Sequence, residues 1–600
     1  MSTSEPTGHR EVRTWPSACR ALSRTLQCAW LLLGAVHCTA MIDGGVNGGP
    51  GSQGSSNGTG ATSSTGTGGN GSGASSAVGT TLDSFTCDSS ATPDPGPSPL
   101  RLLSRTQYLN TLQGLFSTLP DLSAALGADT TYSAAFGLLQ ADIDSVQIGG
   151  YQAAAEAIAT SVVTNPASLS ALAPCASGGD QRACAQTFVQ NFGALAYRTP
   201  ITDPADIARH MVAYDAGAKV SYAHGIELLL RGMLQAPRFL YRVELGTTDA
   251  VGANAVKLSS YEVAARLAYV VWDSLPDAAL NAAAAAGQLA SKDQVTTQLA
   301  RMLADPKGAT FVRRFLEGWI QLPGVDGLVK DTTLYPEWSA AGSTLPASVK
   351  GQARAFFDDL VKNQDGKLDA LLTSSTVFVN KDLASFYGTS SSDAAFTPMT
   401  MSNGQASGLL TLPALLSLMA KPNESWPIYR GKFVREALFC QELPAPPPNV
   451  PKPPDVQPGV STRTRLSQHE TNPSCSGCHS EMDPIGFGFE AYDAIGRYRT
   501  TDGGQPVDAS GELIMTDVDA KFNGVVELGK KLASSTEVRQ CVARQWFRFT
   551  TGRYEQGMDG CSMKGISDAF QSNGLSLNAL PKALVESNAF LYRRPIQVSQ

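Results

Sequence analysis

The pentapeptide Cys475-Ser476-Gly477-Cys478-His479 constrains this chain more than any other part of its sequence. Two thiols three residues apart can form thioether bonds with the two vinyl groups of one haem, and the adjacent histidine can reach the iron as an axial ligand. The chain has only 11 cysteines and 6 histidines in 600 residues, so chance seldom produces this pattern. We therefore expect one covalent haem c per chain, bound through Cys475, Cys478 and His479.

Cys-x-x-Cys pairs also have other uses. A zinc knuckle needs a second ligand pair of similar spacing, but the pattern occurs once in this sequence. A redox dithiol is expected beside a βαβ pattern, which the sequence lacks. A disulfide between Cys475 and Cys478 is the simplest alternative, and it would leave the segment without haem.

The ligand on the far side of the iron is harder to assign. Met482 lies three residues after His479, so on a helix both side chains project from one face and Met482 cannot reach the opposite side. Met515 is our preferred distal ligand, because a thioether raises the potential and suits electron transfer. The other candidates are Met558, Met563 and His469.

Two arginines that follow the motif are candidates for contact with the haem propionates. A guanidinium group binds carboxylates with two parallel hydrogen bonds, and this favours such a role for Arg497 and Arg499. Salt bridges with Asp493 or Asp502 explain the two arginines equally well.

Sequence blocks around the motif resemble a group of exported bacterial proteins. The blocks are 430–435, 443–448, 475–489 and 492–499, with further similar stretches at 103–115, 261–280 and 538–552. That group carries tandem domains of unknown function (1592, with companions 1587, 1595, 1588 and 1585) and a cytochrome-c-like Cys-x-x-Cys-His segment followed by Met-Asp-Pro-x-Gly-Phe. The resemblance implies an exported, haem-bearing protein of unassigned role.

The N-terminal region has the pattern of an export signal followed by a tether. Residues 1–40 combine several arginines with the short apolar run 29–36. Cleavage near Ala40 or lipidation of Cys38 would follow. Residues 43–82 are almost entirely Gly, Ser, Thr and Asn and cannot form a core. We expect a protein of the periplasm, the outer membrane surface or the secreted fraction.

Beyond this tether, apolar residues recur at helical spacing, and no long alternating segment indicates a large sheet. Capping boxes such as Ser104 with Gln107 start several of the expected helices. We predict a mainly α fold of several helical bundles, with a small c-type-haem-like segment and a Pro-rich strap. The predicted parts are a signal peptide (1–40), a Gly/Ser/Thr-rich linker (41–98), an N-terminal helical domain (99–250), a central helical domain (255–425), the Pro-rich strap with the Cys-x-x-Cys-His segment (426–512), and a C-terminal helical domain (513–600).

Six cysteines remain outside the signal region and the motif. They are Cys87, Cys175, Cys184, Cys440, Cys541 and Cys561. An even number suits three disulfides in an oxidising compartment. Sequence proximity favours Cys175–Cys184 and Cys541–Cys561, which leaves Cys87–Cys440.

The net charge and the motifs argue against some classes of function. The net charge of −7 argues against a nucleic-acid partner, and no hydrolase motif is present. We expect electron transfer with an unidentified redox partner. The alternative is a non-redox surface protein that binds an extracellular polymer and carries a Cys475–Cys478 disulfide.

Overall fold

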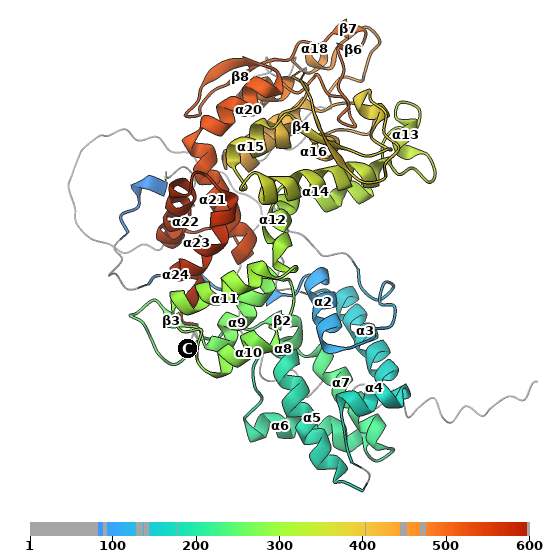
Figure 1. Ribbon diagram of the computed structural model, residues 1–600, viewed down its shortest axis with the longest axis vertical. Coiled ribbons are helices and arrows are strands. Elements are labelled where there is room, and N and C mark those ends of the chain that lie inside the picture. Colours follow the sequence, from blue (N-terminus) through green and yellow to red (C-terminus); the bar gives the residue numbers. More distant parts are fainter. Residues whose placement is uncertain are drawn as a thin grey trace, which may run out of the picture. The chain divides into compact units, whose positions relative to one another are not determined.

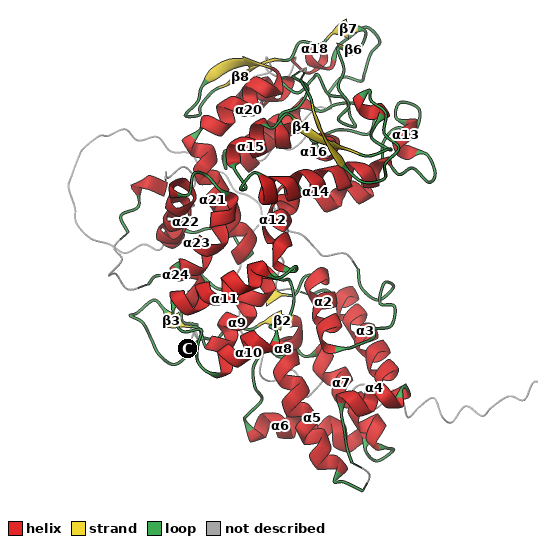
Figure 2. Cartoon of the chain, in the orientation of Figure 1, coloured by secondary structure: helices red, strands yellow, loops and turns green. Residues whose placement is uncertain are grey.

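Helices dominate the computed structural model, and the strands occur only as two-stranded pairs among the residues that it describes (Figures 1 and 2). The mainly α prediction is therefore confirmed. The signal region, most of the linker, Cys475 and His469 lie outside the described residues. Those residues are 82–87, 93–127, 136, 143–176, 178–402, 404–444, 453–467 and 476–596.

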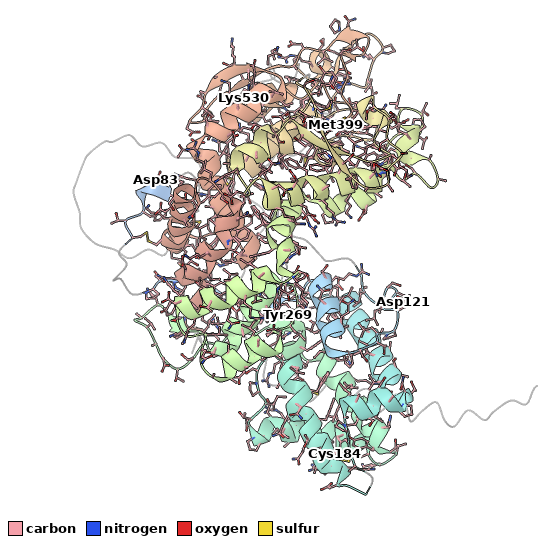
Figure 3. All side chains as sticks on the ribbon, viewed as in Figure 1. Asp83, Asp121, Cys184, Tyr269, Met399 and Lys530 are labelled. Carbon is pink, nitrogen blue, oxygen red and sulfur yellow. A yellow bond between two sulfur atoms is a disulfide. The ribbon has the colours of Figure 1, made fainter. Side chains whose placement is uncertain are left out.

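The first helices share one apolar core. The expected capping box is present, because Ser104 and Gln107 each bond the other's backbone N–H at the start of α2. The core joins the next part of the chain through Tyr269, whose hydroxyl lies 2.8 Å from that of Thr111 (Figure 3). The helices are α2 (Arg105–Leu115), α3 (Ser145–Thr164), α4 (Pro166–Leu172), α5 (Gln181–Ala196), α6 (Pro204–Gly217), α7 (Tyr222–Gln235) and α8 (Pro237–Leu240).

The central and C-terminal helices share a second, continuous core. Phe311 and Phe315 pack on Trp546, whose ring centroid lies 5.0 and 5.1 Å from theirs, so these aromatic side chains of α12 belong to the core. The helices are α9 (Ser260–Val271), α10 (Ala278–Ala285), α11 (Lys292–Ala304), α12 (Phe311–Trp319), α13 (Pro336–Ser339), α14 (Leu345–Asn363), α15 (Leu368–Thr373), α16 (Pro413–Leu418), α20 (Gly524–Ser534), α21 (Thr536–Thr551), α22 (Gly560–Ser572), α23 (Leu580–Glu586) and α24 (Asn588–Leu591). None of the described helices is both long and apolar enough to cross a membrane.

Short antiparallel strand pairs fasten segments that are distant in sequence. The pairs are β1 (Arg101–Leu102) with β2 (Tyr241–Arg242), β3 (Val256–Lys257) with β10 (Tyr592–Arg593), β4 (Thr376–Val379) with β5 (Thr397–Thr400), β6 (Thr501–Asp502) with β7 (Gln505–Pro506), and β8 (Ser510–Leu513) with β9 (Ala520–Asn523). The first two pairs matter most, because each joins parts of the chain that sequence proximity would not bring together.

A segment that we counted as linker packs on the C-terminal helices. Leu82 is fully buried, and its N–H donates to the Gln540 side chain at 3.0 Å. The same glutamine donates to Asp83 at 2.9 Å (Figure 3). Within the described part of the chain, the packed body thus includes residues 82–87, ahead of the predicted domain start at residue 99.

Two of the three predicted disulfides are wrong. Cys175–Cys184 is confirmed, but Cys87 bonds Cys561 and Cys440 bonds Cys541. The two cysteines near the C-terminus sit on different helices, α21 and α22, and face different neighbours. Helical geometry, and not sequence distance, therefore decides the pairing.

We predict that peptide mapping without reduction recovers linked Cys87–Cys561 and Cys440–Cys541 peptides. Cys440→Ser/Cys541→Ser opens a link across 101 residues, which costs about 4 to 5 kcal/mol in the chain-entropy account. Cys175→Ser/Cys184→Ser opens a link across 9 residues and costs less. The first variant should therefore unfold at the lower guanidinium concentration, and recovery of a Cys541–Cys561 peptide would contradict the fold.

Candidate functional site

The described part of the Cys-x-x-Cys-His motif opens helix α19 (Ser476–Phe487). Cys478 is a free, partly exposed thiol, whereas the other described cysteines are all in disulfides. The rest of the described body is thus oxidised, and this one thiol is left available for chemistry beside His479. Cys475 lies outside the described residues.

The imidazole of His479 is held by a carboxylate one helical turn later. Its Nδ1 lies 2.8 Å from Asp483 Oδ2, and the Asp483 side chain is fully buried. A carboxylate accepts hydrogen bonds, so this contact requires the proton on Nδ1. The lone pair is then on Nε2, which is the tautomer of a histidine that binds a metal through Nε2 and is oriented by a carboxylate behind it.

A second helix fixes the position of α19. Helix α17 (Pro427–Phe433) approaches it so closely that a Cβ at Gly431 would lie 1.9 Å from the Met482 carbonyl oxygen, and a Cβ at Gly486 would lie 2.0 Å from that of Pro427. No side chain fits at either position. The two glycines therefore permit this helix pair. Gly431 lies in the block 430–435, and Gly486 lies in the block 475–489, which contains the motif.

Arg435 ties α19 to the loop after β8. It is fully buried on a π-helical turn, Val434–Leu438, which continues α17. Its guanidinium group donates to the Glu481 carbonyl oxygen at 3.0 and 2.9 Å and to that of Ile514 at 2.7 Å. One buried cation thus joins three segments through backbone carbonyl groups.

Arg430 plays a similar part at the other end of α19. It is 2% exposed and donates to the carbonyl oxygens of Phe489, Tyr492 and Asp493 at 3.0, 2.8 and 2.7 Å. Burial lowers the pKa of Arg430 to about 10, so the group stays charged at neutral pH. The turn that follows the helix is therefore held from inside.

The two predicted propionate ligands have carboxylate partners within the protein. Arg499 bonds Glu490 at 2.9 Å and Asp502 at 2.7 Å, so the salt bridge with Asp502 is confirmed. Arg497 pairs with Glu337. Contact of Arg497 and Arg499 with haem propionates stays a prediction, and the structure gives it no further support.

Met515, the preferred distal ligand, lies on the loop that Arg435 holds. It has φ +57° and is 67% exposed, and its carbonyl oxygen accepts from Gln441 Nε2 at 3.0 Å. Met563 is buried in the core around α22, and His469 lies outside the described residues. The choice of Met515 stays a prediction.

Sequence reasoning missed the residues that hold the motif in place. The contact of Asp483 with His479 could have been predicted, because Asp483 comes four residues after His479, a spacing that brings helical side chains together. No local pattern predicts the role of Gly431 and Gly486, since a close helix approach depends on a partner that lies far away in sequence. Arg430 and Arg435 were part of the quoted resemblance but without a role.

We predict that Gly431→Ala and Gly486→Ala each lower the unfolding midpoint, because each new Cβ would overlap a carbonyl oxygen of the neighbouring helix. The expected cost is about 1 to 3 kcal/mol, typical of overpacking. Gly565→Ala, in α22, is the matched control, because its Cβ would meet nothing within 4 Å and alanine favours helices. Equal midpoints for Gly431→Ala and Gly565→Ala would contradict the close contact.

Comparisons with known proteins place these elements in a named series of domains. The chain matches, in order, the descriptions Protein of unknown function (DUF1587) at 101–164, (DUF1595) at 184–244, (DUF1592) at 258–389, (DUF1588) at 406–502 and (DUF1585) at 519–590. Helices α17 and α19 both lie within 406–502. Neither curated proteins nor solved structures gave a match. The chain therefore belongs to the proteins that carry these five domains of unknown function in tandem.

Proposed function

We propose that α19 carries one covalent haem c, bonded through Cys475 and Cys478 with His479 as the proximal ligand, and that the protein transfers electrons outside the cytoplasm. One observation carries this proposal. A free thiol at Cys478 directly precedes a histidine whose Nδ1 is bonded to a buried carboxylate, Asp483, at 2.8 Å. The donor set fits haem, because a histidine protonated at Nδ1 presents Nε2 as the nitrogen that binds a metal.

The residues around the motif fix the position of α19 and the orientation of His479. Bound haem supplies one-electron exchange at its iron. Asp483 keeps the proton on Nδ1 of His479 and fixes the orientation of the ring. The glycine contact with α17 and the hydrogen bonds of Arg435 then keep α19 in one position. A ligand held in this way needs little rearrangement when the charge of its metal changes.

Disulfide chemistry supports the proposed location. Three disulfides form in the described residues, and structural disulfides persist in oxidising compartments. We propose export to the periplasm, the outer membrane surface or the medium, with Cys38 as a lipid anchor where that cysteine is processed. The proposed electron partner is an unidentified redox protein. We propose a polymer outside the cell as a further partner.

We predict that the wild-type protein, made in cells competent for cytochrome c maturation, keeps its haem stain on a denaturing gel. The tryptic peptide with Cys475 and Cys478 should carry the added mass of one haem. Cys475→Ser/Cys478→Ser should lose both signals, while Cys175→Ser/Cys184→Ser should keep them. A wild-type peptide with a Cys475–Cys478 disulfide would favour the non-redox surface protein instead.

We predict that Asp483→Asn raises the reduction potential. The carboxylate increases electron density on the imidazole and stabilises oxidised iron, and a neutral amide removes that effect. A tenfold change in the equilibrium corresponds to about 60 mV for one electron, so we expect a rise of that order in a spectroelectrochemical titration.

Glu481→Gln is the matched control for this experiment. It removes a carboxylate from the same helix, and the hydrogen bonds from Arg435 go to the Glu481 backbone oxygen, which the substitution keeps. The control should shift the potential by much less than Asp483→Asn. Equal shifts in the two variants would show that Asp483 acts only through its charge at a distance.

A further inference from the structure

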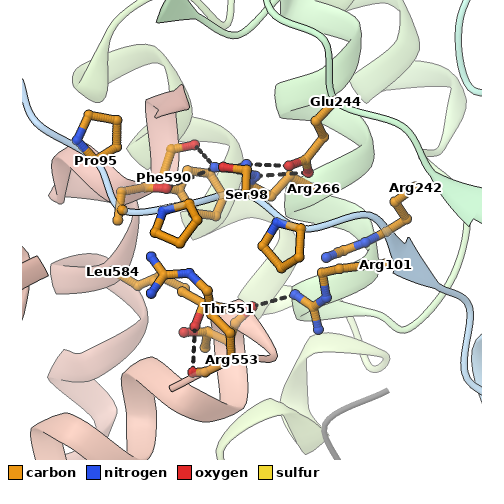
Figure 4. Close-up of a pocket in the computed structure, with 15 residues that line it drawn as sticks. Pro95, Ser98, Arg101, Arg242, Glu244, Arg266, Thr551, Arg553, Leu584 and Phe590 are labelled. Atoms are coloured by element: carbon orange, nitrogen blue, oxygen red, sulfur yellow. Dashed lines mark hydrogen bonds and ion pairs between the residues drawn. The ribbon is translucent and has the colours of Figure 1, made fainter. Parts of the chain in front are cut away.

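A small cavity lies among segments that α19 does not touch (Figure 4). Its volume is about 40 Å³, enough for two or three water molecules or for one small ion. Its walls come from the proline-rich segment 95–99, β1, β2, α9, the end of α21, and the region of α23 and α24. The cavity therefore borders several segments that are distant in sequence.

Positive charge dominates the wall of this cavity. Four arginines and one glutamate line it. Arg266 bonds Glu244 at 2.9 Å, and Arg553 bonds the buried Asp559 at 2.6 and 2.7 Å. Among the described residues, Arg101 and Arg242 have no such ion pair, although Glu244 acts on both from a longer distance. In the described part of the chain, neither has a carboxylate within salt-bridge distance.

The two remaining arginines face each other. Arg101 and Arg242 are directly opposite in the β1–β2 ladder, an arrangement in which like charges repel. Figure 4 shows their guanidinium groups close together. Arg101 Nη1 donates to the Thr550 carbonyl oxygen at 2.9 Å. Arg242 is 6% exposed, and its Nη1 is buried without a hydrogen-bond partner among the described residues.

The charge of Glu244 reaches both arginines, but only from beyond salt-bridge distance. Burial, and after it the charge of Arg242, lowers the pKa of Arg101, and burial also lowers the pKa of Arg242. Guanidinium groups nevertheless stay protonated in proteins, so two facing cations persist here, and Arg242 is buried. A buried, unpaired polar nitrogen costs about 1 to 3 kcal/mol, and more when it carries charge. An anion between the two groups would offset both the repulsion and the missing hydrogen bond.

We propose that a small tetrahedral oxyanion, of the phosphate or sulfate class, binds between Arg101 and Arg242. Guanidinium groups match the oxygen geometry of such anions and bind them with paired, charge-assisted hydrogen bonds. Arg242 Nη1 supplies the donor that has no partner. The anion joins β1 and β2 to the end of α21, because Arg101 already bonds Thr550 there. It thereby braces the N-terminal helices against the C-terminal ones.

Calorimetric titration of the full chain with inorganic phosphate, in chloride at constant ionic strength, tests the site. We expect one saturable site per chain, a phosphate-dependent rise in the unfolding midpoint, and competition by sulfate. Arg242→Met keeps the aliphatic stem but should weaken phosphate binding at least tenfold. Without phosphate its midpoint should equal or exceed that of the wild type, since one of two facing charges is gone.

Arg182→Met is the control, because it breaks an exposed ion pair with Asp215 and should leave phosphate binding unchanged. Arg101→Lys keeps the charge and loses the fork, so it should bind phosphate more weakly and provides a second variant if Arg242→Met does not fold. The proposal is overturned if the wild type shows no saturable phosphate heat. It is also overturned if acetate binds and phosphate does not, or if a folded Arg242→Met keeps wild-type affinity.

Discussion

The contact between α17 and α19 is the constraint on which the candidate site depends. Two glycines, Gly431 and Gly486, let the backbone of each helix meet a carbonyl oxygen of the other at distances that no side chain would allow. Packed interiors do not deform smoothly, so this contact sets the position of α19 within narrow limits. Cys478 and His479 inherit that position because they lie on the same helix.

Buried arginines also hold α19 in place, and they do so by hydrogen bonds to the backbone more than by salt bridges. Arg430 and Arg435 direct their hydrogen bonds mainly to backbone carbonyl oxygens of turns and helix ends. A carbonyl oxygen has two lone pairs and can accept from an arginine as well as from a backbone N–H, and a guanidinium group has five donors to offer. Arg101 and Arg242 are different, because their acceptors are too few. Arg430 and Arg435 thus have several acceptors each, whereas Arg242 Nη1 has none among the described residues.

The sequence predicted what depends on local spacing. The capping box of Ser104 is present, since it needs only neighbours within the helix. Prediction from the sequence failed for contacts between residues that are distant in the chain. Cys541 lies 20 positions from Cys561 in sequence, but it bonds Cys440 across 101 residues. For the same reason, the contacts of Gly431 and Gly486 and the facing pair Arg101 and Arg242 could not be predicted. Asp483 alone was within local reach of the motif.

The corrected disulfide also connects the body to the site. Cys440 follows the π-helical turn that carries Arg435, and its bond to Cys541 anchors that turn on α21. The Ala437 carbonyl oxygen of the same turn accepts from Trp319 Nε1 at 3.0 Å and from Gln545 Nε2 at 3.2 Å. Single π-turns leave carbonyl groups free in this way and recur at functional sites. The disulfide thus anchors the turn on α21, and the turn holds α19 through the hydrogen bonds of Arg435.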